Sequence, residues 1–260
     1  MNAIKNALHT LFTFRWKPGL DLLSVLISCV LVSASLYTAT VIITPETGGG
    51  MPYFLIYAGL TAAVFGIGIP LVWMVSYRKR PLRDLGITKK YLGTSIVLQL
   101  ILTVFQYLAT LAKVELPALE KVAPLFALAL AIGYFEALFW RGWVLLRLEE
   151  AFGLIPAIIL GSALYAAYHV GYGMPLEEIL FLFWIGVLYA VSFRLTRNIF
   201  ILWPLYQPLG QMVTLIRDGL ELPLIATLGF AEAFIVMLVF VWLANKVYHK
   251  QLGKKNQPVS

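Results

Sequence analysis

Long apolar segments constrain this chain more than any other feature. A helix that crosses the hydrocarbon core of a bilayer needs about 20 mainly apolar residues, and the sequence contains eight candidate segments with little chain between them. These segments are 20–44, 53–76, 94–112, 122–147, 156–172, 178–193, 198–215 and 222–245. Since 60% of the 260 residues are hydrophobic and only 13% are charged, we expect an all-α, polytopic membrane protein in which residues 1–260 form a single bundle.

The basic residues are distributed unevenly among the predicted loops. If the N-terminus is cytoplasmic, the cytoplasmic segments hold 16 of the 20 Lys and Arg residues, whereas the outer loops hold only Lys113, Lys121 and Arg217. Cytoplasmic loops collect Lys and Arg, so the pattern predicts that both termini are cytoplasmic, in a protein of the cell (plasma) membrane. Anionic lipid headgroups then account for the net charge of +7, and no Gly-rich phosphate loop or aromatic RNA motif indicates nucleic-acid binding.

Two stretches outside the spans mix basic and apolar residues and are expected to lie along the membrane interface. They are residues 7–16 and residues 81–93. The single cysteine, Cys29, lies in the first predicted span. One cysteine excludes an intrachain disulfide, a Cys-based zinc site and a Cys-cluster cofactor, and no cofactor is predicted.

Four polar side chains occur at similar depth in three predicted spans. Ionisable groups inside a span cost about 2.5–3.5 kcal/mol on insertion scales and are usually paired or functional. A helical rise of about 1.5 Å per residue places Glu136 roughly 17 Å, His169 roughly 20 Å, and Gln207 and Gln211 roughly 15 to 21 Å from the inner boundary. The shared depth predicts one buried polar site near the middle of the membrane.

Local spacing suggests how these side chains are supported. Tyr165 and His169 are four residues apart and share a helix face, so the tyrosine hydroxyl can orient the imidazole. Pro204 and Pro208 are expected to bend the seventh span and open a polar pocket. Arg141 follows the glutamate by five residues, which favours contact with a neighbouring helix or the headgroups over a direct ion pair.

The order of these residues resembles the motifs of the CPBP family, the CAAX prenyl proteases and bacteriocin-processing enzymes also called the Abi family. The family motif E-E-x-x-x-R falls on Glu136, Ala137 and Arg141. The motif F-x-x-x-H falls on Tyr165 and His169. The resemblance covers roughly residues 80–215 and implies an intramembrane bundle of about eight helices.

The third family motif, H-x-x-x-N, falls on Gln207 and Gln211, so both of its residues differ. The second glutamate of the first motif is also absent, because Ala137 occupies its position. A glutamine NH2 group can still donate hydrogen bonds. In the scheme that the resemblance implies, the third-motif residues donate hydrogen bonds to the oxyanion formed during peptide hydrolysis. Losing one such donor typically costs about 100- to 1000-fold in rate, so these departures bear directly on whether catalysis survives.

The resemblance implies an intramembrane, glutamate-dependent peptidase that acts on a membrane-proximal peptide or protein. In that family scheme Glu136 and His169 activate a water molecule, Arg141 and Tyr165 support them, and Gln207 and Gln211 are the oxyanion candidates. The sequence does not identify the substrate.

Other interpretations remain open at the level of sequence. Glu136 and His169 can be structural residues of a catalytically inactive scaffold or regulator that binds a membrane partner. Glu232, near the middle of the last span, can replace the missing carboxylate, mark a proton path or satisfy a neighbouring polar group. A proton-relay transporter is disfavoured because no inverted repeat is present, and a metal enzyme because H-E-x-x-H is absent.

Overall fold

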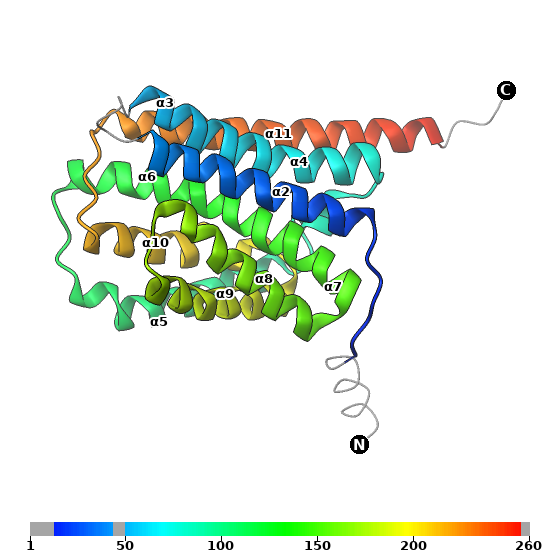
Figure 1. The fold of residues 1–260 in the computed structure, drawn as a ribbon, viewed down its shortest axis with the longest axis horizontal. Helices are drawn as coiled ribbons and strands as arrows, with labels where there is room; N and C mark the ends of the chain where they lie inside the picture. Colours follow the sequence, from blue (N-terminus) through cyan, green and yellow to red (C-terminus); the bar gives the residue numbers. More distant parts are fainter. Residues whose placement is uncertain (1–12, 44–49, 256–260) are drawn as a thin grey trace, which may run out of the picture.

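The computed structural model describes residues 13–43 and 50–255, and its long helices lie side by side along the long axis of the molecule (Figure 1). The α-helices are α2 (Leu20–Tyr37), α3 (Met51–Phe54), α4 (Ile69–Leu71), α5 (Leu92–Ala109), α6 (Leu119–Glu136), α7 (Leu146–Phe152), α8 (Leu154–Tyr168), α9 (Leu176–Thr196), α10 (Tyr206–Arg217) and α11 (Ala226–Lys255). The described residues contain no strand, and the predicted all-α fold is confirmed.

Several long helices combine α-helical and π-helical segments. The first, α2, continues through η1 (Thr38–Ile42), and α3, η3 (Leu55–Gly68), α4 and η4 (Val72–Tyr77) form one uninterrupted helix. A third such helix is built from α6, η7 (Ala137–Leu145) and α7. Because π-helical turns are frequent at functional sites, the junction between α6 and η7 is of special interest.

Seven helices in the described part of the chain are long and apolar enough to cross a membrane. They are Leu20–Ile42, Met51–Tyr77, Leu92–Ala109, Leu119–Phe152, Leu154–Tyr172, Leu176–Thr196 and Ala226–Gly253. Each begins within a few residues of a predicted apolar segment. The chain is therefore an integral membrane protein, as the composition indicated.

The remaining predicted segment, 198–215, does not form one spanning helix. It contains the 3₁₀ turn η9 (Ile199–Ile201), a further turn, and then α10. At about 1.5 Å per residue, the 12 residues of α10 cover about 18 Å, which is less than the hydrocarbon core of about 30 Å. Pro204 lies in the turn and Pro208 in the first turn of α10, where proline is tolerated. The prolines thus precede and begin a short helix instead of bending a long one.

The helix formed by α6, η7 and α7 lies at the centre of the bundle. Its most apolar window is 72% buried, compared with 11% for α5 and 17% for α11. Trp140 and Trp143 are almost completely buried. Because α10 and α11 pack against α6, and α8 packs against η7 and α7, this helix can bring side chains of several neighbours to one point.

Residues 81–93 pack closely against the central helix and the start of the seventh segment. A Cβ atom at Gly142 would collide with the carbonyl oxygen of Leu85, so the two backbones can approach only because residue 142 is glycine. The buried Asn198 donates to the carbonyl oxygens of Thr88 and Lys90 at 2.9 and 3.1 Å. These contacts fix the backbone that leads into α10.

The described ends of the chain lie at the same end of the bundle, where α2 begins and α11 ends (Figure 1). Of the stretch 7–16 expected at the interface, residues 7–12 lie outside the described residues. Residues 13–17 run beside the end of α7, because the backbone N–H groups of Arg15 and Lys17 donate to Phe152 and Ala151, each at 3.0 Å. Residues 13–17 are therefore attached to α7 at the end of the bundle that carries most of the basic residues.

Candidate active site

Glu136 is buried where α6 passes into η7, with 2% of its surface exposed. Its Oε2 atom accepts hydrogen bonds from Nε2 of Gln207 and Nε2 of Gln211, both at 2.7 Å. The Tyr165 hydroxyl makes a longer contact of 3.5 Å to the same oxygen. All three donors approach Oε2, so no donor among the described residues holds the other oxygen, Oε1. The carboxylate is thus fixed through one oxygen while the second is left for another partner.

The two glutamines lie on one face of α10 because they are four residues apart. Gln207 is 1% exposed, and the Oε1 atoms of both glutamines have no partner among the described residues. Each amide NH2 group carries two hydrogens, and the bond to Glu136 uses one of them. The short helix α10 therefore brings both of its glutamine side chains to the carboxylate of Glu136.

His169 follows directly after the end of α8 and is 6% exposed. Its Nδ1 atom lies 2.8 Å from the backbone carbonyl oxygen of Tyr165. A carbonyl oxygen only accepts hydrogen bonds, so Nδ1 carries the hydrogen, and the neutral ring has an accepting Nε2 atom. The prediction that the Tyr165 hydroxyl orients the imidazole is wrong, because that hydroxyl points to Glu136 and the backbone carbonyl orients the ring instead.

Glu136 and His169 line the same cavity, which has a volume of about 260 Å³. Tyr165 and Gln211 also line it, whereas Gln207 does not. No direct hydrogen bond joins Glu136 to His169 in the described residues. One wall of the cavity is apolar and is formed by leucine, isoleucine and phenylalanine side chains of α6 and α9. Of the four residues expected at one depth, Glu136, His169 and Gln211 line this cavity, and Gln207 contacts Glu136 without lining it.

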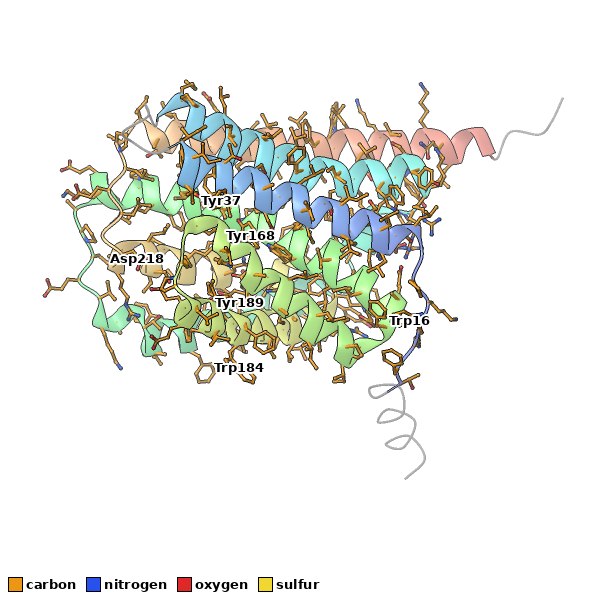
Figure 2. All side chains as sticks on the ribbon, in the orientation of Figure 1. Trp16, Tyr37, Tyr168, Trp184, Tyr189 and Asp218 are labelled. Atoms are coloured by element: carbon orange, nitrogen blue, oxygen red, sulfur yellow. The ribbon has the colours of Figure 1, made fainter. Side chains whose placement is uncertain are left out.

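One end of the cavity reaches the loops farthest from the chain ends. Thr110, Arg217 and Asp218 contribute to its lining, and Figure 2 shows Asp218 at the end of the bundle opposite Trp16. Tyr168 and Tyr189 lie between these two ends. The cavity thus extends from the buried carboxylate toward the end of the molecule that carries few basic residues.

Arg141 is 1% exposed and does not form an ion pair with Glu136. Its guanidinium group lies over the ring of Tyr165 at 4.8 Å and near that of Tyr189 at 5.9 Å, distances typical of cation–π contacts. Its Nη1 atom has no partner among the described residues. The expected contact with neighbouring helices is therefore confirmed, and the positive charge lies beside the residues that surround the glutamate.

Three tyrosine hydroxyls form a chain that was not predicted from the sequence. The Tyr57 and Tyr172 oxygens are 2.7 Å apart, and the Tyr172 and Tyr168 oxygens are 2.9 Å apart. Tyr57 and Tyr172 line the cavity, and the rings of Tyr168 and Tyr172 pack against His169. Tyr57 comes from η3, far along the sequence, so only the spacing of four between Tyr168 and Tyr172 could have indicated a shared face.

Two further expectations concern carboxylates and metal ions. Glu232 lies on an exposed face of α11 and does not line the cavity, so it does not replace the carboxylate missing at the buried Ala137. In the part of the chain that the structure describes, no three His, Cys, Asp or Glu side chains are grouped as metal ligands.

Comparison with known proteins supports the resemblance seen in the sequence. Residues 118–206, about a third of the chain, match a family model described as type II CAAX prenyl endopeptidase Rce1-like. The match includes Glu136, Arg141, Tyr165 and His169, and it ends one residue before Gln207. Neither a curated protein nor a solved structure matches the chain. The predicted similarity to the CPBP family is thus confirmed.

The two glutamine bonds generate a stability prediction with an internal control. Replacing Gln207 with leucine removes a donor from a buried carboxylate, and hydrogen bonds to charged groups contribute about 1.5–3 kcal/mol. Gln207→Leu is therefore expected to lower the free energy of unfolding by that amount, measured by reversible denaturation in detergent.

The matched control is Gln99→Leu on α5. Gln99 is also buried, but its amide nitrogen has no hydrogen-bond partner among the described residues, so its loss should leave stability nearly unchanged or raised. Equal effects of the two changes would show that the bonds to Glu136 do not contribute to the fold.

Proposed function

We propose that the protein is an intramembrane glutamate-dependent peptidase that hydrolyses a peptide bond in a membrane-proximal segment of another protein. The observation that carries this proposal is the placement of Glu136 and His169 on one cavity. Among the described residues, neither Oε1 of the glutamate nor Nε2 of the histidine has a hydrogen-bond partner. The family match over residues 118–206 supports the same activity.

In the proposed reaction a water molecule binds between Oε1 of Glu136 and Nε2 of His169. Glu136 takes a proton as the water oxygen forms a bond to the carbonyl carbon of the substrate, and His169 accepts the hydrogen bond from the other proton. The tetrahedral intermediate then collapses as the carbon–nitrogen bond breaks. Glu136 returns its proton to the leaving nitrogen, and the products are a carboxylic acid and an amine.

Stabilisation of the developing oxyanion requires donors that face the cavity. Gln211 lines the cavity and keeps a second amide hydrogen after its bond to Glu136. The tyrosine chain offers another donor: three hydroxyl hydrogens serve two mutual hydrogen bonds, so one remains, and Tyr57 and Tyr172 both line the cavity. Together they supply donors where the family motif has a histidine and an asparagine, although Gln207 itself does not reach the cavity.

The basic residues suggest the side from which a substrate enters. The end of the bundle where α2 begins carries most of the basic residues, whereas the cavity extends to the opposite end at Arg217 and Asp218. The positive-inside rule assigns the basic end to the cytoplasm. We therefore propose cytoplasmic termini in the plasma membrane, and a substrate that enters from the outer side.

A non-catalytic regulator is the second candidate, and a specific observation favours it. Both glutamines donate to Glu136. In a regulator these two hydrogen bonds are a purely structural link between α6 and α10. In that case the carboxylate needs only its role as acceptor, and the cavity binds part of a membrane partner.

Removing the proposed base separates the two candidates. Glu136→Gln keeps the size of the side chain and an oxygen that accepts from both glutamines, but it cannot take a proton. Cleavage of membrane proteins, measured by quantifying newly formed peptide termini in cells that produce each variant, should fall about 100- to 10,000-fold at equal abundance in the membrane.

Glu232→Gln is the matched control. It makes the same change at a glutamate that is exposed and does not line the cavity. Its cleavage products should remain at the wild-type level. If Glu136→Gln is as abundant and leaves the peptide termini and the cellular phenotype unchanged, the peptidase proposal fails and the regulator proposal stands.

The proposed orientation is tested by cysteine labelling in a Cys29→Ala background. Glu115→Cys, in the loop before α6, should react with a membrane-impermeant maleimide in intact cells, because that loop is expected outside. Lys250→Cys, near the end of α11, should react only after the membrane is opened. Reaction of both positions from the same side would contradict the proposed orientation, in which the chain ends are cytoplasmic and the loop before α6 is outside.

A further inference from the structure

A second cavity, of about 290 Å³, lies at the end of the bundle that carries the chain ends. It is formed where the end of α7 meets residues 80–84 and the segment that precedes α2. Five arginines and three carboxylates line it, which leaves two positive charges in excess. The peptidase scheme uses none of these residues.

The three carboxylates are already paired with arginines. Arg80 binds Glu150 at 2.6 Å and Asp84 at 2.8 Å, and these hydrogen bonds, that to Glu150 most of all, raise the pKa of Arg80 above its ordinary value. Glu149 accepts from Arg194 at 2.9 Å and from Arg197 at 2.5 Å. All three carboxylates are therefore paired with arginines, and Oε2 of Glu149 is the one buried carboxylate oxygen of this set without a partner among the described residues.

Donors remain on three other arginines. The Arg15 side chain has no partner among the described residues, and Arg83 has only Asp84, at 3.9 Å. The side chain of Arg147 is 2% exposed and also pairs with Glu150 at 3.1 Å through Nη2, yet its Nε–H has no acceptor among the described residues. A buried, charged donor without an acceptor is costly, so the cavity offers both the charge and the hydrogen bonds that an anion needs.

Aromatic side chains place this cavity at the level of the lipid headgroups. Phe14 and Trp16, on either side of Arg15, are 63% and 71% exposed, and the Trp16 ring packs against Phe152 at the end of α7 at 5.4 Å. Exposed tryptophans are typical of membrane–water interfaces. Figure 2 shows Trp16 at this end of the bundle.

We propose that this arginine cavity binds the phosphate group of an anionic lipid from the cytoplasmic leaflet. Guanidinium groups match phosphate oxygens through paired hydrogen bonds, and basic pockets between helices at this level are suited to anionic headgroups. Because Arg15, Arg83 and Arg147 belong to separate parts of the chain, a bound phosphate joins the segment before α2, the 81–93 segment and the central helix. Binding therefore stabilises the fold.

The test is thermal unfolding of the full-length protein in neutral detergent, titrated separately with short-chain phosphatidylglycerol, short-chain phosphatidylcholine and inorganic phosphate. Phosphatidylglycerol should raise the melting temperature, and phosphatidylcholine should not. The double variant Arg15→Gln/Arg83→Gln should weaken the apparent affinity for phosphatidylglycerol roughly 30-fold, the factor that corresponds to about 1 kcal/mol for each cation.

The control is Lys89→Gln/Lys90→Gln, which removes two charges from the same end of the bundle without altering the cavity lining. This pair should keep the wild-type affinity. Equal stabilisation by inorganic phosphate would support the phosphate site and assign it to a soluble ligand instead of a lipid. The absence of stabilisation by either anion, or an equal loss in the lysine pair, would overturn the proposal. None of these readouts depends on peptidase activity.

Discussion

The burial of one carboxylate near the middle of the membrane is the constraint on which the arrangement of this protein depends. An isolated charge at that depth is costly, and Glu136 is surrounded by the two amide groups of α10 and the hydroxyl of Tyr165. These contacts join α6, α8 and α10 at a single oxygen atom. The geometry of the site is therefore also part of what holds the bundle together.

The asymmetry of that carboxylate links stability to chemistry. Oε2 satisfies the structural requirement, since every donor to Glu136 among the described residues approaches it. Oε1 is left without a donor, and Glu136 and His169 line the same cavity. In the proposed enzyme both glutamines position the base, and Gln211 also keeps a hydrogen for the oxyanion. This is how the proposed enzyme would do without the histidine and asparagine of the family motif.

Hydropathy and helical rise predicted the parts of this structure that follow from the membrane itself. The apolar segments gave the spans, and counting residues from the inner boundary placed Glu136, His169, Gln207 and Gln211 at one depth. Seven spans and the grouping of these side chains agree with the structure. The depth of a side chain is predictable because a helix rises by about 1.5 Å per residue and the ends of a spanning helix lie at the membrane boundaries.

Rotation about the helix axis and irregular backbone were not predictable in the same way. Glu232 has a suitable depth but lies on an exposed face of α11, and depth alone does not give direction. The carbonyl of Tyr165 is available to orient His169 because α8 ends at Tyr168. The short α10 follows an irregular segment in which Asn198 is bonded to the carbonyl oxygens of Thr88 and Lys90, and such long-range contacts are not visible in the sequence. Tyr57 joins the site from a distant part of the chain, so only the tertiary structure reveals it.

The most direct test of the central claim is an experimental structure of the protein in a lipid bilayer, at a resolution that shows ordered water. We expect a water molecule within about 2.6–3.2 Å of both Oε1 of Glu136 and Nε2 of His169, with the two glutamine amides on Oε2. A carboxylate turned away from His169, or a cavity filled at that point by an acyl chain or a side chain, would contradict this expectation.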